Sequence, residues 1–276
     1  DSVIGIDCVL LPNGHSEVHY WVCYGRTIED VHRLNRRVEK EGPVYLIKST
    51  NDYWQAWVKK ESLNLEPLEK KLQNLFMKSL VTIRVHTDNT GAIIASSDTD
   101  MLHHGRDTYS YVWPRDGAYI AHALDRAGYD DVAKRFYSFA AKHREPGGYL
   151  MHKYRCDGVL GSSWHPWMRG ETPQLPIQED ETAIVIYMLW WHYKRTKDLE
   201  YIESLYNDFI EPAADFMAGH IEAELGLPQP SYDLWEEKYG SSTYTASCVY
   251  GALIAASNFA NTLGKDEAAR TYLAVA

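Results

Sequence analysis

From Asn64 onward, apolar residues recur at the three- and four-residue steps of an amphipathic helix. This pattern predicts helices over residues 65–83, 116–127, 131–143, 181–195, 199–224, 244–263 and 265–276. The fifth of them should be kinked or split at Pro212, because proline cannot donate a hydrogen bond inside a helix. Such a chain buries its apolar stripes by packing helix on helix, so we predict a mostly α-helical domain.

The connections between these helices are long. Residues 84–115, 144–180 and 225–243 are rich in glycine, proline and tryptophan, whereas helix connections in a bundle usually take about two to eight residues. Long loops on a helical scaffold commonly carry functional residues. We therefore expect the three loops to converge on one rim and to form a funnel with a carboxyl group at its base.

Residues 1–60 follow a different pattern. Two strand-like segments, 3–11 and 17–24, flank a turn signal, and a short charged helix follows that should end before Gly42. We predict that residues 1–60 are the end of a β-domain and a linker, and that residues 61–276 form the helical domain.

The composition narrows the possible partners. Hydrophobic residues make up 45% of the chain and charged residues 24%, which is typical of a packed globular core. The net charge of −10 argues against nucleic acid or an anionic membrane as the main partner, and no apolar run is long enough to span a membrane. Nine Trp and twenty Tyr offer aromatic faces that stack on sugar rings, so a carbohydrate is the better ligand prediction.

The four cysteines are scattered along the chain and predict neither a zinc site nor a disulfide framework. We see no site for a metal or a redox cofactor. No signal peptide is visible, so we expect a cytoplasmic rather than a secreted protein. The chain begins at Asp1 without a methionine, as if it were cut from a longer one.

The first long loop ends in alternating aromatic residues and then in Arg115 and Asp116, at the start of a predicted helix. An aspartate at this position is a natural N-cap, so one interpretation is a cap with a local ion pair. The other is a polar clamp, in which Arg115 donates hydrogen bonds to sugar hydroxyls and Asp116 accepts them.

The second long loop carries Trp164 and Trp167 around a His-Pro pair and ends in Glu179, Asp180 and Glu181. Carboxylates at a helix N-terminus are stabilised by the helix dipole without any function, and we favour this interpretation for the three acids. The two tryptophans are harder to explain as core residues, because they lie in a polar loop.

The third long loop sets Glu236 and Glu237 beside Trp235. Adjacent carboxylates repel and a neighbouring ring desolvates, so one of the two acids should hold its proton to a higher pH than the other. This environment suits a general acid that works near neutral pH. A solvated acidic loop with a packing tryptophan is the alternative.

Three motifs in these loops together resemble the family 15 glycoside hydrolases, which include glucoamylases, glucodextranases and some microbial trehalases. They are Tyr-x-Trp-Pro-Arg-Asp at 111–116, Leu-Pro-Ile-Gln-Glu-Asp-Glu-Thr-Ala at 175–183, and Ser-Tyr-Asp-Leu-Trp-Glu-Glu at 231–237 with Tyr-Thr-Ala at 244–246. The resemblance covers roughly residues 60–276. It implies an incomplete (α/α)6 barrel, preceded by the end of a β-sandwich domain that residues 1–60 resemble only weakly.

The resemblance also implies an activity and a set of roles. The activity is inverting, exo-acting hydrolysis of α-glucosidic bonds at the non-reducing end of oligo- or polysaccharides, which releases β-glucose. Glu236 would be the general acid, and Glu237 would contact substrate in the neighbouring subsite. The other implied substrate-binding residues are Arg115, Asp116, Tyr109, Trp113, Trp164 and Trp235.

The general base of the family is expected elsewhere. Inverting hydrolysis needs two carboxyl groups about 6.5–9.5 Å apart, with a water between them. Glu236 and Glu237 share one local backbone and cannot flank opposite faces of a sugar. Because the family carries its base in the C-terminal half of the barrel, we expect that residue beyond Ala276.

Three other functions stay open at this point. A non-catalytic regulatory or carbohydrate-binding module, like the large subunits of phosphorylase kinase, would share the scaffold, although the intact Trp-Glu-Glu triplet weighs against it. A helical-barrel phosphorylase would use phosphate as its nucleophile. Trehalase specificity is also possible, because trehalose, maltose, isomaltose and dextran all present the same terminal glucose to Arg115 and Asp116.

Overall fold

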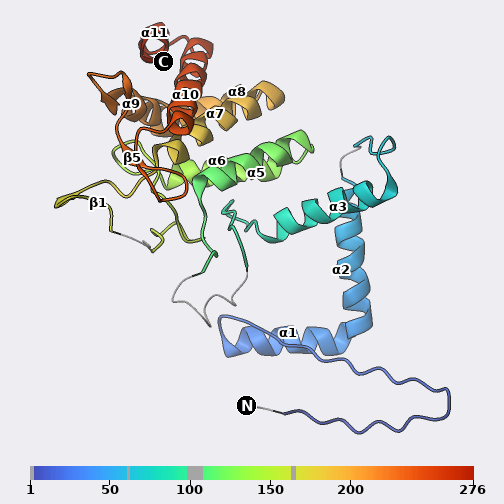
Figure 1. The fold of residues 1–276 in the computed structure, drawn as a ribbon. Helices are drawn as coiled ribbons and strands as arrows, with labels where there is room; N and C mark the ends of the chain where they lie inside the picture. The colour runs from blue at the N-terminus through green and yellow to red at the C-terminus, as the bar shows by residue number, and fades with distance from the viewer. Residues whose placement is uncertain (1–2, 61–62, 98–107, 163–165) are drawn as a thin grey trace. The chain divides into compact units, whose positions relative to one another are not determined.

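The computed structural model describes residues 3–60, 63–97, 108–162 and 166–276. The chain divides into two compact units, Asp1–Lys60 and Glu61–Ala276 (Figure 1). Among the described residues, no helix combines the length and the apolar character that a membrane span requires.

The first unit contains two helices, α1 (Ile28–Glu41) and α2 (Pro43–Val58). The Thr27 hydroxyl caps α1 by accepting a hydrogen bond from the backbone N–H of Asp30 at 3.1 Å. Gly42, with a φ of 82°, ends α1, and Pro43 then opens α2 at a position where proline suits a helix start. The predicted charged helix is confirmed, whereas α2 was not predicted.

The two segments that we expected to be strands, 3–11 and 17–24, are extended but form no β-ladder among the described residues. Their apolar side chains lie in solvent, as Val9 does at 93% exposure. An isolated hairpin is only marginally stable in water, because a strand needs a packed face as well as a partner. The assignment of this unit to the end of a β-sandwich therefore stays a prediction.

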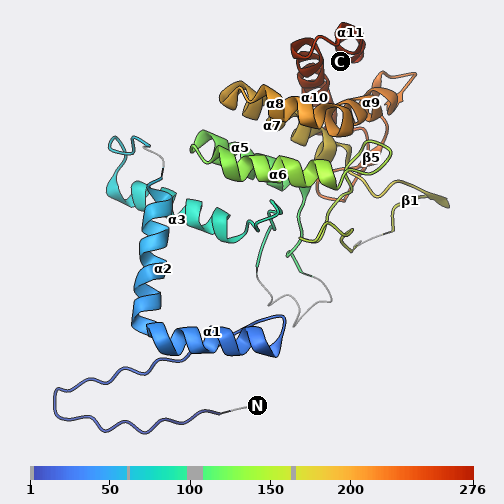
Figure 2. The same cartoon turned by 180° about the vertical axis from the view of Figure 1, so that it is seen from behind.

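The second unit is helical, with its elements in hairpins (Figures 1 and 2). Its helices are α3 (Lys70–Val85), α5 (Pro114–Arg126), α6 (Asp130–Lys142), α7 (Glu179–Thr196), α8 (Leu199–Leu205), α9 (Glu211–Gly219), α10 (Thr243–Thr262) and α11 (Asp266–Val275). A π-helical turn, Tyr206–Ile210, joins α8 to α9, and Pro212 lies in the first turn of α9. The predicted split near Pro212 is confirmed.

Helices α5, α7 and α10 pack side by side, and α6, α9 and α11 pack against them. Helix α7 lies in the middle of the inner row and is buried along most of its length, because it has neighbours on both sides and behind it. The long loops all lead into the inner helices. This connectivity gathers the loops at the N-terminal ends of α5, α7 and α10.

The strands of this unit are short and shape the loops rather than the core. Among the described residues, they form three antiparallel pairs: β1 (Met168–Arg169) with β2 (Thr172–Pro173), β3 (Ile221–Glu222) with β4 (Leu227–Pro228), and β5 (Ser231–Tyr232) with β6 (Tyr239–Gly240). The β5–β6 hairpin carries the Trp-Glu-Glu triplet at its tip.

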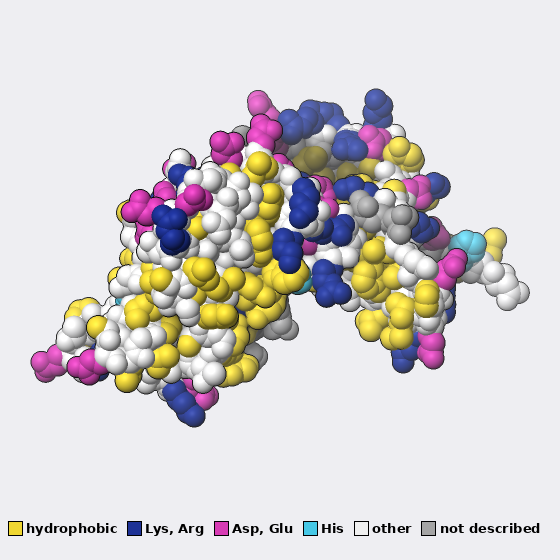
Figure 3. Space-filling model, turned by 90° about the horizontal axis from the view of Figure 1, so that it is seen from above, with side chains coloured by type: hydrophobic (Ala, Val, Ile, Leu, Met, Phe, Trp, Pro, Cys, Tyr) yellow, Lys and Arg dark blue, Asp and Glu magenta, His cyan; other side chains and the backbone are white. Residues whose placement is uncertain are grey.

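One side of the inner row keeps exposed aromatic residues within this unit. Tyr119 on α5, Trp191 on α7 and Tyr250 on α10 are large rings that remain exposed. Hydrophobic side chains also gather in patches on the face shown in Figure 3. Exposed apolar area of this kind usually marks a surface that another part of a protein covers.

The contact between α5 and α6 is tight enough to test by adding one methyl group. A Cβ on Gly117 would lie 2.1 Å from the Phe136 ring, which is fully buried. We expect Gly117→Ala to destabilise the protein by about 1–3 kcal/mol through overpacking. Gly219→Ala is the matched control, because a Cβ there meets no atom within 4 Å. Thermal unfolding of the full-length variants measures the difference, and equal melting temperatures would contradict this packing.

Candidate active site

A cavity of about 400 Å³ opens where the loops before α5 and α10 meet. Its lining contains six of the residues that the sequence predicted, and these are Tyr109, Trp113, Arg115, Asp116, Trp235 and Glu236. Ala95 and Leu234 are the other described residues of the lining. Of the other two predicted residues, Glu237 does not line the cavity and Trp164 lies outside the described residues.

The turn at the tip of the β5–β6 hairpin separates the two adjacent acids. The side-chain carboxylate of Asp233 accepts hydrogen bonds from the backbone N–H groups of Glu237 and Lys238, at 2.9 and 3.3 Å. The Asp233 carbonyl accepts one from Glu236 N at 2.9 Å. Within this turn Glu236 has a φ of 59°, a left-handed conformation that costs a non-glycine residue of order 1–3 kcal/mol.

This backbone conformation directs the three side chains of the triplet differently. The Glu236 side chain is only 13% exposed and lines the cavity. Trp235 is 75% exposed at the cavity's edge, and Glu237 is exposed. The structure therefore places the two acids differently, whereas the local residue pattern left them equivalent and only the family resemblance gave them different roles.

A buried histidine, His152, lies against the Glu236 carboxylate. Its Nε2 atom is 2.9 Å from Glu236 Oε1, and its side chain is 5% exposed. The rings of Trp113 and Trp167 flank it, with centroids 6.3 and 5.3 Å from the imidazole. This cage restricts the positions open to both the imidazole and the carboxylate.

Sequence reasoning missed His152, because no motif surrounds it and it lies far from Glu236 along the chain. The backbone bridge between Val112 and Tyr154 brings this part of the second loop beside the first. Lys153, also buried, places its ammonium group 4.7 Å from the Tyr111 ring and 5.3 Å from the Trp113 ring. These contacts hold the aromatic wall of the cavity in place.

Arg115 joins the first loop to the start of α7. Its guanidinium lies 2.7 Å from Asp180 Oδ2 and 3.0 Å from Glu181 Oε1. Both terminal nitrogens donate to Gln178 Oε1 at 3.1 Å. The amide nitrogen of Gln178 in turn donates to the Asp233 carbonyl, so one chain of contacts links all three loops.

The acids at the start of α7 are fully buried, which goes beyond the helix-dipole interpretation that we favoured from sequence. Burial raises the pKa of Asp180 and of Glu181, and the Arg115 charge opposes this shift in both. Burial alone would lower the pKa of Arg115, but the charges of Glu181 and Asp180 raise it, so Arg115 stays protonated. These acids thus serve as partners of Arg115 as well as forming the helix start.

Glu179 differs from its two neighbours. Neither of its carboxylate oxygens has a hydrogen-bond partner among the described residues. Burial, and secondarily the charge of Asp180, raises the pKa of Glu179 to about 8. Glu179 is therefore expected to be largely protonated at neutral pH.

The chain is similar to known proteins over most of its length. The model of the glycosyl hydrolases family 15 matches residues 70–276. The chain belongs to this family. The match begins at the first residue of α3 and includes every loop that lines the cavity.

Two relatives show how far the similarity extends. An uncharacterized glycosyl hydrolase of Methanocaldococcus jannaschii is 27% identical over 219 residues, covering 78% of this chain and 32% of the relative. Trehalase 2 of Sulfolobus acidocaldarius is 30% identical over 216 residues, covering 71% and 36%. The chain thus spans about a third of the length of the curated relatives that it matches.

Solved structures confirm the predicted fold. A bacterial glucoamylase complexed with acarbose superposes with a TM-score of 0.73 at 23% identity, covering 92% of this chain and 34% of that one. A glycosidase in complex with glucose gives a TM-score of 0.57 at 22% identity, covering 75% and 56%. The helical unit therefore matches part of an (α/α)6 barrel, as predicted.

The raised pKa of Glu179 predicts a pH-dependent stability. An acid whose pKa is raised on folding from 4.5 to about 8 stabilises the fold below its unfolded pKa and loses that stabilisation as the pH rises through about 8. Glu179→Gln removes this titration, so between pH 6 and pH 9 the wild type should lose more stability than the variant. Melting temperatures of the full-length proteins at both pH values measure this.

Glu171→Gln is the matched control, because Glu171 is exposed in the loop that precedes α7. This variant should follow the wild type at both pH values. If Glu179→Gln also follows the wild type, the carboxyl of Glu179 titrates as an ordinary glutamate and the prediction is wrong.

Proposed function

We propose that the protein to which this chain belongs is an inverting, exo-acting glycoside hydrolase, which releases β-glucose from the non-reducing end of α-glucosides. One observation carries the proposal. The Glu236 carboxylate lines a cavity together with three aromatic residues and the Arg115–Asp116 pair. A shielded carboxyl among sugar-binding groups is the arrangement that a glycosidase acid needs.

In the proposed reaction, protonated Glu236 transfers its proton to the glycosidic oxygen as the bond to the anomeric carbon breaks. A water attacks that carbon from the opposite face and loses a proton to the general base. We expect this base beyond Ala276, on a part of the protein that this chain does not include. The products are β-glucose and the shortened sugar.

The other cavity residues would bind the terminal glucose. Tyr109 and Trp113, whose ring centroids are 5.9 Å apart, form an apolar wall against which a pyranose can lie. Asp116 would accept hydrogen bonds from hydroxyls, while Arg115 would donate with N–H groups not used at α7. Trp235, exposed at the edge, would contact the next sugar unit, and Glu237 and Trp164 stay predicted contacts there.

His152 would act as a positioning residue for the acid. A carboxylate on a strained turn needs a fixed neighbour to stay oriented toward the scissile bond. The 2.9 Å contact from His152 Nε2 supplies one, and the flanking tryptophans hold the imidazole.

Two specificities fit the cavity. Relatives of this chain include a trehalase, at 30% identity, and a glucoamylase of a Clostridium strain, at 26% identity. Both enzyme classes remove a non-reducing glucose, and they differ in the group that occupies the next subsite. We therefore propose an α-glucoside substrate and leave the choice between α,α-1,1 and other α-linkages to a sugar panel.

Replacing the carboxyl group of Glu236 tests this proposal. Glu236→Gln in the full-length protein should lower turnover on the cleaved α-glucoside by about 10² to 10⁴, because general acid catalysis typically contributes that factor. Glu237→Gln is the matched control and should keep a larger share of the activity, since Glu237 is exposed and does not line the cavity. Initial rates on trehalose, maltose and isomaltose measure both effects.

Near-wild-type turnover of Glu236→Gln would rule out Glu236 as the acid. The absence of hydrolysis of every α-glucoside by the wild type would instead favour a non-catalytic carbohydrate-binding role for the same cavity.

A further inference from the structure

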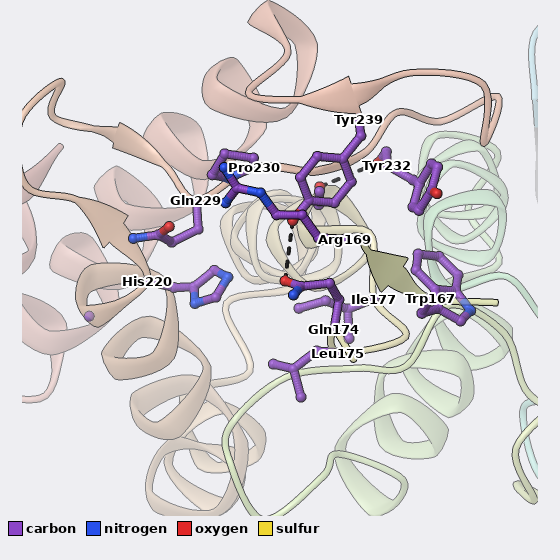
Figure 4. Close-up of a pocket in the computed structure, with 12 residues that line it drawn as sticks. Trp167, Arg169, Gln174, Leu175, Ile177, His220, Gln229, Pro230, Tyr232 and Tyr239 are labelled. Carbon is purple, nitrogen blue, oxygen red and sulfur yellow. Dashed lines mark hydrogen bonds between the residues drawn. The ribbon is translucent and has the colours of Figure 1, made fainter. Parts of the chain in front are cut away.

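A second cavity, of about 230 Å³, lies beside the same loops (Figure 4). It is formed by the β1–β2 region, the end of α9 and the strands of the β5–β6 hairpin. None of its described lining residues lines the cavity of Glu236. The two cavities nevertheless approach each other, because Trp167 lines the second cavity and its ring lies 5.3 Å from the His152 ring beside Glu236.

Three aromatic rings form the apolar walls of this second cavity. Tyr232 stands nearly perpendicular to both of its neighbours, with Trp167 at 5.5 Å and 85° and Tyr239 at 5.4 Å and 81°. Edge-to-face contacts of this kind are favourable and fix the orientation of each ring. The cavity thus has preformed aromatic surfaces, which suit the apolar face of a pyranose.

Polar groups surround these rings. The Arg169 guanidinium lies 5.8 Å from the Tyr239 ring centroid, and no carboxylate of the described residues pairs with it. The Gln229 amide nitrogen donates to the Ile221 carbonyl at 3.1 Å, which leaves the amide oxygen as an acceptor. A ligand in this cavity would meet both a donor and an acceptor.

His220 can supply both a hydrogen-bond donor and an acceptor to the same cavity. Its ring stacks on Phe216 at 4.9 Å, and burial lowers its pKa below the ordinary value. A neutral imidazole has one nitrogen that donates and one that accepts. Hydroxyl groups need both functions, so this lining matches a polyhydroxylated ligand.

We propose that this cavity is a second carbohydrate site, which binds one pyranose ring apart from the cavity of Glu236. Its volume is below the range of about 300–1,000 Å³ that drug-sized ligands occupy, so a single ring suits it better than a chain. Among the described residues of the lining, Arg169 is the only lysine or arginine, which favours a neutral sugar over a phosphorylated one. The choice of glucose as the sugar rests on the proposed function.

The test is a calorimetric titration of the full-length protein with D-glucose, with and without saturating acarbose. Acarbose is the ligand in the solved bacterial glucoamylase and should occupy the cavity of Glu236. We expect saturable glucose binding in the presence of acarbose, weakened at least fivefold by Arg169→Leu. Arg155→Leu is the matched control, because Arg155 is an exposed arginine, paired with Asp157, that lines neither cavity.

Two results would overturn the second site. One is that no glucose binding remains once acarbose is bound, and the other is that Arg169→Leu binds glucose as tightly as Arg155→Leu. Hydrolysis assays on the same variants separate the two proposals. Hydrolysis without Arg169-dependent binding rejects the second site alone, whereas Arg169-dependent binding without hydrolysis supports that site and rejects the catalytic assignment.

Discussion

The arrangement of the loops depends on the buried contact between Arg115 and the first turn of α7. Asp180 and Glu181 lie wholly out of solvent and face one guanidinium. Removing one partner of a buried ion pair is costly, because the remaining charges lose their compensation. This contact therefore fixes the start of α5 against the start of α7. It also holds Arg115 in its position in the cavity lining.

Gln178 connects this ion pair to the turn that carries Glu236. Its side chain accepts a hydrogen bond from Arg115 and donates one to the Asp233 carbonyl. The carbonyl and the carboxylate of Asp233 accept the hydrogen bonds of this turn, in which Glu236 has a left-handed conformation. The strain at Glu236 persists because the surrounding hydrogen bonds determine the turn. An acid held in this way can face a substrate without rearranging first, which is the condition for effective proton transfer.

The sequence predicted the helices of residues 61–276 well, since periodicity and breakers such as Pro212 act locally, but it missed α2. It also selected the cavity residues, because the three motifs mark the loop ends that the inner helices bring together. It missed His152 and the burial of Glu179, which depend on contacts between distant segments. The predicted strands of residues 1–60 failed for a related reason, because strand pairing depends on a packed face that local pattern does not supply.

The central claim is that Glu236 protonates an α-glucoside while water attacks from the opposite face. Proton NMR of the first products formed by the full-length protein tests this most directly. The anomeric signal of β-glucose should appear first from an α-linked substrate, followed by slow mutarotation. An initial signal from α-glucose would contradict the inverting mechanism. It would also contradict the expectation that a water lies between Glu236 and the general base.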